Sequence, residues 1–288
     1  MNKRIGGCVT REERSEVSYL ALGDSANRLT ESAVRSAIQT LNPAPGSKGL
    51  DAGCGLGNHT LWLAEAVAPD GHVTGVDIDD RALSLAEEKA SKGPLKDNVT
   101  FKIGDIRRLP FEEDSFDWAW SADVLYLWLF GKGNVDEIAV PIMKELARVV
   151  KPGGTVALLF WSLHSLLPGY PLLEARLNAT NAATFAGPGG IKPELHSSRA
   201  LGWMQKAGLK DPRAQSFVID IQPPFDEETK ETMVGILEMY WEKTKSEVSS
   251  RDWNEYLRLC RPDSPEFILD LPDYHGQIAY TLYYGGVE

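Results

Sequence analysis

The sequence predicts an α/β fold in which a mostly parallel sheet is covered by helices on both faces. Strand-like and helix-like segments alternate between residues 48 and 161. A glycine-rich turn follows the first strand and leads directly into a helical segment, and the second strand ends in acidic residues. Such alternation is typical of parallel sheets, because parallel neighbours need a long crossover that is usually a helix.

The glycine-rich turn lies within residues 49–60, which read Gly-Leu-Asp-Ala-Gly-Cys-Gly-Leu-Gly-Asn-His-Thr. Glycine tolerates positive φ and lets a ligand approach the backbone, and the free N–H groups of the next helix face that ligand. Asn58 or Thr60 can cap this helix with a side-chain oxygen. We therefore expect a binding site at this turn.

Two common phosphate-binding turns do not match these residues. A P-loop requires Gly-Lys-Ser/Thr, which the turn lacks. The dinucleotide fingerprint requires a glycine where Asn58 stands. Asp51 precedes the first glycine, and its carboxylate suits a ligand with an ammonium group, directly or through water, and repels a pyrophosphate.

Apolar spacing and turn residues predict the remaining elements in order. Residues 1–16 are expected to be loose, before a helix over 24–41 that Pro43 ends. Further along we expect the following segments: strand 71–80, helix 81–91, strand 99–105, strand 115–123, helix 136–150, strand 155–161, a helical patch at 172–184, helix 200–207, strand 215–221, two helices within 225–275, and strand 278–284.

Asp77 is the first candidate for a ribose-binding acid. It ends the apolar second strand about twenty residues after the glycine turn, where a nucleotide-binding βαβ unit places such an acid. A carboxylate there accepts short hydrogen bonds from both ribose hydroxyls. Ile78 beside it can pack on an adenine face, whereas Asp79 or Asp80 is expected to cap the next helix.

Two later strand ends supply further candidates. Asp105 can accept from an adenine amino group with Ile106 beside the ring, or it can simply form a turn. Residues 121–126, beginning with Ser121, should face the site, because ligands collect at the carboxyl ends of parallel strands.

The chain resembles the class I methyltransferases that depend on S-adenosylmethionine (SAM), in particular the small-molecule branch similar to the UbiE/COQ5 group. The resemblance covers residues 48–161. It rests on these stretches: Asp51-Ala-Gly-Cys-Gly-Leu-Gly, Val76-Asp-Ile-Asp, Gly104-Asp-Ile, Phe116-Asp and Leu146-Ala-Arg-Val-Val-Lys-Pro-Gly-Gly. The Asn-Phe-Gly stretch of quinone C-methylating relatives is missing.

The resemblance implies a Rossmann-like, seven-stranded, mostly parallel sheet whose last strand is antiparallel, with a helical insertion between strands six and seven. SAM would lie over strands one to four, and its methyl group would pass to a small-molecule acceptor by in-line displacement. The expected cofactor-binding residues are Asp51, Gly53, Cys54, Gly55, Asp77, Ile78, Asp105, Ile106 and Ser121.

No catalytic residue can be assigned from the sequence. The candidates for a base or a positioning group are His164, Tyr126, Tyr170, His196 and Asp123, of which the first four are placed by topology only. His59 is expected to be structural because it lies in the first turn of a helix, and the role of His275 stays open.

Composition limits the classes of molecule that the protein is expected to bind. The formal charge of −11 disfavours nucleic acid and anionic lipid surfaces. The cysteines at 8, 54 and 260 are far apart, so neither a disulfide framework nor a metal site is expected. No apolar run reaches the length of a membrane span, and the first 14 residues are too polar for a signal peptide, so we expect a soluble cytoplasmic protein.

The sequence divides into four expected parts. Residues 1–45 form an N-terminal segment with a helix over the cofactor, and 46–222 form the SAM-binding core with a cap segment around 162–200. Residues 223–276 are the helical insertion, which either covers the pocket mouth or forms a homodimer contact, and 277–288 return as the last core strand. Two alternatives remain, an NAD(P)-dependent oxidoreductase and a catalytically silent SAM-binding protein.

Overall fold

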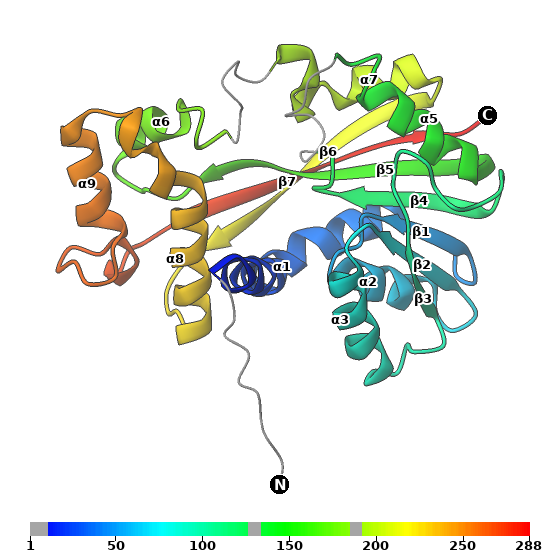
Figure 1. Cartoon of the computed structure of the whole chain (residues 1–288), viewed down its shortest axis with the longest axis horizontal. Helices are drawn as coiled ribbons and strands as arrows, with labels where there is room; N and C mark the ends of the chain where they lie inside the picture. The colour runs from blue at the N-terminus through cyan, green and yellow to red at the C-terminus, as the bar shows by residue number, and fades with distance from the viewer. Residues whose placement is uncertain (1–10, 126–133, 185–191) are drawn as a thin grey trace, which may run out of the picture.

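A seven-stranded sheet organises the computed structural model, which describes residues 11–125, 134–184 and 192–288. The strand order is β3-β2-β1-β4-β5-β7-β6 (Figure 1). The strands are β1 Lys48–Ala52, β2 His72–Asp77, β3 Val99–Ile103, β4 Phe116–Ala122, β5 Val150–Ser165, β6 Lys210–Ile221 and β7 Gly276–Gly286. Strand β7 runs antiparallel to both β5 and β6. The predicted seven-stranded, mostly parallel sheet with an antiparallel last strand is confirmed.

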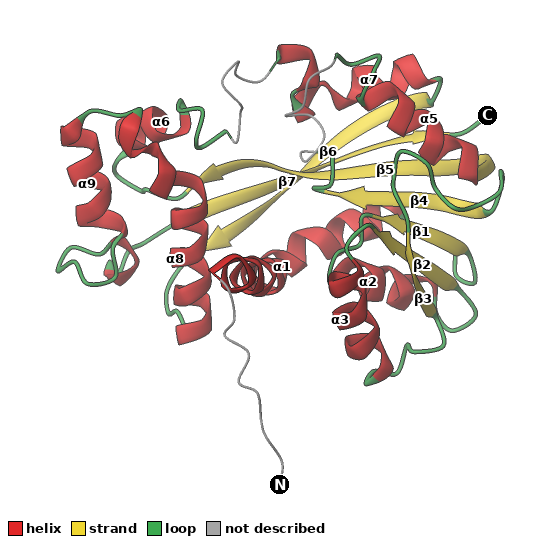
Figure 2. Cartoon of the chain, viewed as in Figure 1, coloured by secondary structure: helices red, strands yellow, loops and turns green. Residues whose placement is uncertain are grey.

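Helices cover both faces of this sheet, as Figure 2 shows. On one face lie α1, α2 and α3, and on the other lie α5 and α7. The α-helices of the described residues are α1 Arg11–Leu41, α2 Asn58–Val67, α3 Asp80–Ser91, α5 Ala139–Val149, α6 Pro171–Asn178, α7 Ala200–Ala207, α8 Glu227–Trp241 and α9 Ser250–Cys260. The predicted layered architecture is therefore confirmed.

Each face of the sheet has its own apolar core. Val34, Leu63 and Trp120 are buried on the face that carries α1 and α2. Leu146 of α5 and Trp203 of α7 are buried on the opposite face. Burial of such side chains supplies the main stabilising term, roughly 1.5–3 kcal/mol for each large apolar side chain.

The strands nearest the C-terminus extend the sheet on one side. Strand β4 ends its pairing with β5 at Ala122, whereas β5 continues to Ser165 along β7. The long strands therefore project past the carboxyl end of β4, and α6, α8 and α9 lie around this projection (Figure 1). Helix α1 contacts α2, α8, β6 and β7, so the insertion and the N-terminal helix meet at the same place.

Some local predictions were wrong. Residues 11–16, expected to be loose, belong to α1. The alternation of strand and helix is interrupted once, because the described residues 104–115 between β3 and β4 form turns and no helix. Strand β5 begins at Val150 rather than at residue 155, since the Pro-Gly-Gly segment stays within the strand.

The capping of α2 also differs from the prediction. Gly57 is the N-cap, with φ 73°, and no side chain caps the helix. The two expected capping side chains are engaged elsewhere: the Asn58 amide donates to Asp24 of α1, and the Thr60 hydroxyl donates to Asp51. Asp79, by contrast, caps α3 as predicted, accepting from the backbone of Arg81 at 2.9 Å.

The sequence predicts that no apolar segment is long enough to span a membrane. Within residues 11–125, 134–184 and 192–288, no helix is both long and apolar enough to cross a bilayer.

Candidate cofactor and acceptor site

The glycine turn after β1 adopts a conformation that other residues rarely adopt. Gly53, Gly55 and Gly57 have φ values of 83°, 49° and 73°. A Cβ on Gly53 would lie 2.0 Å from Val124, whereas a Cβ on Gly55 would have nothing within 4 Å. The first glycine is therefore required by packing, and the second borders open space at the carboxyl end of β1.

Asp77 anchors this turn from the end of β2. Its Oδ2 accepts from the backbone N–H of Gly55 at 2.8 Å, and its Oδ1 accepts from the backbone N–H of Asp79 at 3.0 Å. An ionised carboxylate has about four acceptor positions, so further hydrogen bonds remain available to a ligand. Ile78, the next residue, is 55% exposed, which leaves an apolar side chain uncovered beside the carboxylate.

Asp51 and Cys54 are buried beneath the same turn. The Asp51 carboxyl is only 1% exposed and accepts from the Thr60 hydroxyl at 2.7 Å. Burial raises the pKa of Asp51 to about 7, helped by the nearby Asp77 charge and opposed by the Thr60 hydrogen bond. Burial likewise raises the pKa of the Cys54 thiol. Both side chains are therefore packed beneath the turn, away from the solvent.

The candidates at β3 and β4 have local partners. Asp105 follows β3 and accepts from the backbone N–H of Arg107 at 2.9 Å. The Arg107 guanidinium binds the same carboxylate and is the main reason that the pKa of Asp105 lies below its usual range. Ile106 is buried in the core, and the buried Ser121 hydroxyl donates to the Ala52 carbonyl at 2.8 Å.

The predicted cofactor residues therefore gather at one edge of the sheet. The strands β3, β2, β1 and β4 are adjacent and parallel, so their carboxyl ends meet there. Asp77, Gly55 and Ile78 form its accessible part, whereas Asp51, Cys54, Ile106 and Ser121 are buried behind it. What each residue contributes to ligand binding stays a prediction.

A match to a protein-family model identifies the family to which this chain belongs. Residues 43–208, more than half of the chain, match the sequence model of a family described as "Methyltransferase domain". The chain belongs to this methyltransferase-domain family. The predicted resemblance to class I SAM-dependent methyltransferases is confirmed, and S-adenosylmethionine is the cofactor that this family implies.

Individual relatives agree with this assignment. A demethylmenaquinone methyltransferase of Staphylococcus aureus is 40% identical over 114 residues, which are 40% of this chain and 43% of that protein. The match thus spans less than half the length of the curated relative. Among solved structures, the YcgJ protein of Bacillus subtilis has a TM-score of 0.53 at 19% identity, over 90% of this chain and 99% of that one.

A second solved structure carries the same fold. The geranyl diphosphate C-methyltransferase of Streptomyces coelicolor A3(2) has a TM-score of 0.52 at 15% identity, over 98% of this chain and 88% of that one. At these identities the two solved structures show a shared fold.

The residues of this methyltransferase fit an adenosyl cofactor. The open space over Gly55 gives it room, and the anchored Asp77 carboxylate faces the same turn. Exposed Ile78 offers an apolar surface for a ring. A carboxylate next to neutral backbone groups suits hydroxyls and cations better than phosphates, in agreement with a sulfonium-bearing nucleoside.

A mixed polar and aromatic cluster lies next to this cofactor edge. Asp123 follows β4 with φ 55°, and its Oδ1 accepts from the backbone N–H of Trp161 at 2.8 Å. The Tyr280 hydroxyl of β7 hydrogen-bonds the same carboxyl, and the Trp161 and Tyr280 rings lie 5.9 Å apart. Tyr240 of α8 lies 6.0 Å from the Trp161 ring and 4.4 Å from His164. We call Asp123, Trp161, His164, Tyr240 and Tyr280 the Asp123 cluster.

The other catalytic candidates lie outside this cluster. The Tyr170 hydroxyl accepts from the Arg258 guanidinium of α9 at 3.2 Å, and the exposed His196 pairs with Ser198 at 2.8 Å. Tyr126 lies outside the described residues. His275, which the sequence left open, binds the exposed Asp220 at 2.9 Å. Two of the five candidates, Asp123 and His164, are therefore brought together.

His59 has the structural surroundings that its position predicts. Its Nδ1 accepts from the Trp120 indole N–H at 3.3 Å, and its ring stacks on Trp62 at 5.4 Å. Burial lowers its pKa to about 4, so the ring is neutral at pH 7. The Nε2 atom is buried and has no partner among the described residues.

Sequence reasoning missed the aromatic members of the cluster. It placed Tyr240 in an amphipathic helix and Tyr280 in the last strand without assigning either to the site. Their meeting depends on the antiparallel register in which Trp161 faces Tyr280. The one signal in the sequence is the density of Trp and Tyr residues after strands four and five, which favours an apolar or aromatic acceptor.

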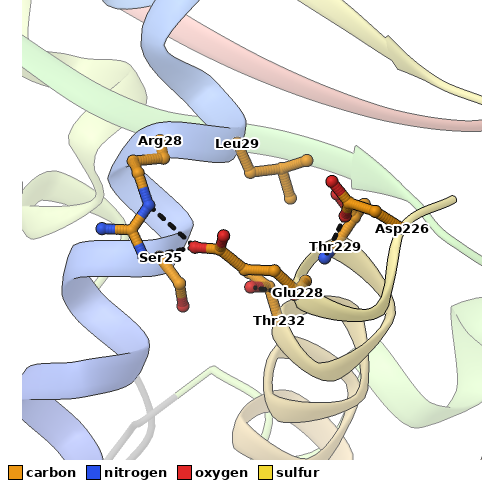
Figure 3. A pocket seen from close by; sticks show the side chains of 7 residues that line it. All are labelled: Ser25, Arg28, Leu29, Asp226, Glu228, Thr229 and Thr232. Carbon is orange, nitrogen blue, oxygen red and sulfur yellow. Dashed lines mark hydrogen bonds and ion pairs between the residues drawn. The ribbon is translucent and has the colours of Figure 1, made fainter.

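A separate surface groove of about 330 Å³ lies between α1 and α8. Figure 3 shows Arg28 and Glu228 reaching toward each other across it, and the Arg28 Nε donates to Glu228 Oε1 at 2.9 Å. The groove is lined by Ser25, Arg28, Leu29, Asp226, Glu228, Thr229 and Thr232. Arg28 also pairs with Asp24 of its own helix, and its pair with Glu228 joins the N-terminal helix to the insertion.

Metal ligation was not expected. Across the described part of the chain, no group of three or more His, Cys, Asp or Glu side chains is arranged to hold a metal ion.

Proposed function

We propose that this protein transfers the methyl group of SAM to a small, aromatic or largely apolar acceptor by in-line displacement. The observation that carries the proposal is the Gly55–Asp77 arrangement at the carboxyl edge of a methyltransferase sheet. SAM supplies an electrophilic methyl group bonded to a positively charged sulfur. The protein's part is to hold both reactants in line.

Alignment alone can accelerate such a transfer strongly. Fixing two reactants in attack geometry supplies about 7–11 kcal/mol of the barrier. The glycine turn and Asp77 would hold the adenosyl end, while the projection of β5 and β7 would hold the acceptor. Tyr240 and Trp161, both partly exposed, provide aromatic surface on that side. Covering the site with α1 and α8 would exclude water from the reacting atoms.

The chemistry of the acceptor is supported by the cluster and by one relative. The aromatic lining favours a ring-bearing acceptor. The relative from Staphylococcus aureus is named for a demethylated menaquinone, which is an aromatic quinone, although its match covers 43% of that protein. A quinol therefore belongs in the panel of acceptors, together with other phenols and with aromatic amines.

A transfer assay tests the proposal. Purified protein is incubated with SAM carrying a radiolabelled methyl group and with each acceptor, and SAM binding is measured separately by calorimetry. We expect binding of SAM and labelling of at least one ring-bearing acceptor. Binding without transfer to any acceptor would favour a silent SAM-binding protein. Tight NADH binding in a fluorescence titration, without SAM binding, would favour the oxidoreductase.

A further inference from the structure

The strand end after β4 carries a carboxyl group that the cofactor site does not use. Asp123 lies directly after Ala122, and its own N–H donates to the Leu159 carbonyl of β5 at 3.0 Å. The next residue, Val124, packs against Gly53 of the cofactor turn. The Asp123 carboxyl therefore belongs to the residue directly before one whose side chain contacts the turn.

The contacts of Asp123 leave room for a substrate. Its carboxyl receives the Trp161 backbone N–H and the Tyr280 hydroxyl, and the residue as a whole is partly exposed. Two of about four acceptor positions are thus occupied, and the others can accept a hydroxyl. The Tyr280 hydroxyl beside this carboxyl is itself an aromatic hydroxyl, the group that the acceptor would present.

The surroundings also hold the carboxyl in a fixed position. Tyr280 is 4% exposed and meets Thr30 of α1, so the phenol is fixed between the sheet and the N-terminal helix. Trp161 and Tyr240 border Tyr280 and form the aromatic wall. A ring that lies against this wall can direct a hydroxyl at Asp123.

We propose that Asp123 accepts the proton of an aromatic hydroxyl on the methyl acceptor, and that Tyr280 is the positioning residue for this carboxyl. The inference rests on the proposed function. The acceptor O–H bond breaks and its proton passes to the Asp123 carboxylate, which later releases it to water. The resulting phenolate oxygen is the nucleophile. As it bonds to the methyl carbon, the methyl–sulfur bond breaks and its electron pair stays on sulfur.

His164 is a weaker choice for this role. Its Nε2 is paired with the Asn178 amide oxygen at 3.2 Å, and burial lowers its pKa. A neutral imidazole whose Nε2–H is donated to an amide has only Nδ1 left as an acceptor. The ring packs on Tyr240, which makes it part of the wall.

The ionisation of Asp123 predicts a pH dependence. Burial raises its pKa to about 6, and the hydrogen bonds from Trp161 and Tyr280 oppose that rise. Tyr280 in turn faces Thr30 of α1 and Tyr240 of α8. Among the described residues, the groups that shift the pKa of Asp123 include no cation. Removing the Tyr280 hydroxyl should therefore raise this pKa, because the charged form loses a donor.

The test uses the full chain saturated with S-adenosylhomocysteine, and two probes that differ by one exchangeable proton. Affinities for 2-naphthol and 2-methoxynaphthalene are measured by calorimetry from pH 5 to pH 8. We expect the wild type to prefer 2-naphthol by about tenfold or more, as for a hydrogen bond to a charged group. This preference should appear as the pH rises through about 6.

Three variants make the test specific. D123N should abolish the preference while keeping the affinity for 2-methoxynaphthalene. Y280F should keep the preference and move its midpoint up by about half to one pH unit. D117N is the matched control, because Asp117 lies at the opposite end of β4 and pairs with Lys151. It should behave like the wild type.

The outcomes separate this inference from the proposed function. If S-adenosylhomocysteine binds but the wild type shows no preference for 2-naphthol, Asp123 is not the proton acceptor. A preference that survives in D123N contradicts it equally, and an unmoved midpoint in Y280F contradicts the positioning role. If S-adenosylhomocysteine itself does not bind, the proposed function fails and this inference fails with it.

Discussion

The backbone N–H of Gly55 donates to the carboxylate of Asp77 at 2.8 Å, joining the turn after β1 to the end of β2. This hydrogen bond fixes the carboxylate beside the open space over Gly55. The contact couples the two sequence features that predicted the site, an acid-led glycine turn and an acid at the next strand end.

Replacing Asp77 with alanine should weaken SAM binding. Loss of a charged hydrogen-bond acceptor costs about 1–3 kcal/mol, so the dissociation constant should rise by roughly 5- to 150-fold. Titration calorimetry measures the change. D80A is the control, because Asp80 is exposed in the first turn of α3. An unchanged affinity in D77A would remove Asp77 from the cofactor site.

Replacing Gly55 with alanine should block the cofactor more than it harms the fold. The added methyl group meets nothing within 4 Å, but it fills the space that the ligand needs. Alanine at φ 49° costs about 1–2 kcal/mol of stability. SAM affinity should fall by roughly tenfold or more, about 1.4 kcal/mol.

Gly153 provides the matched control for this substitution. It also has positive φ and open space, at 83°, but it lies at the start of β5 and away from the carboxyl ends of β1 and β2. G153A should lose stability without losing SAM affinity. Equal losses of affinity in both variants would show that backbone strain alone accounts for the effect.

The buried Asp51 should make stability fall as the pH rises. Its pKa is about 7 in the folded protein, against 3.8 for the unperturbed group, so the native state binds more protons between these values. The free energy of unfolding should therefore fall from about pH 4 to pH 7, by up to about 1.4 kcal/mol per pH unit. Urea unfolding of the wild type and of D51N across this range isolates the effect as a difference. If the free energies of unfolding of the wild type and D51N change with pH in parallel, the raised pKa of Asp51 is contradicted.

His59 should have the opposite effect over nearly the same range. Its folded pKa is about 4, against 6.5 when unperturbed, so the unfolded chain binds more protons between these values. Its contribution to stability is therefore present above about pH 6.5 and lost as the pH falls toward 4. The H59N variant keeps an acceptor for Trp120 and removes the titration. Compared with H59N, the wild type should gain stability as the pH rises, and a flat difference curve would refute the buried neutral histidine.

Local chemistry explains which parts of the fold could be predicted. Asp79 caps α3, and Gly208 ends α7 with φ 92°, because each position requires a residue of that type. Alternation and apolar spacing located the strands. The predicted caps of α2 were wrong because the Asn58 and Thr60 side chains have partners outside the helix, Asp24 and Asp51, which the capping pattern does not contain.

The acceptor side could be predicted only in outline. Asp123 and His164 follow strands four and five, so topology placed both near the site. The contact between Asp123 and Tyr280 depends on the register of β5 and β7, which pairs Trp161 with Tyr280. The register of a strand pair is set by the packing of the whole sheet. Asp123 and Tyr280 are far apart in the sequence, so no local pattern predicts that they meet.

A crystal structure with S-adenosylhomocysteine tests the central claim most directly. We expect the adenosyl group at the carboxyl ends of β1 and β2, with its ribose hydroxyls donating to Asp77 and its sulfur directed toward Asp123. Electron density for the ligand elsewhere, or none at this edge at saturating concentration, would contradict the claim that Gly55 and Asp77 hold the cofactor.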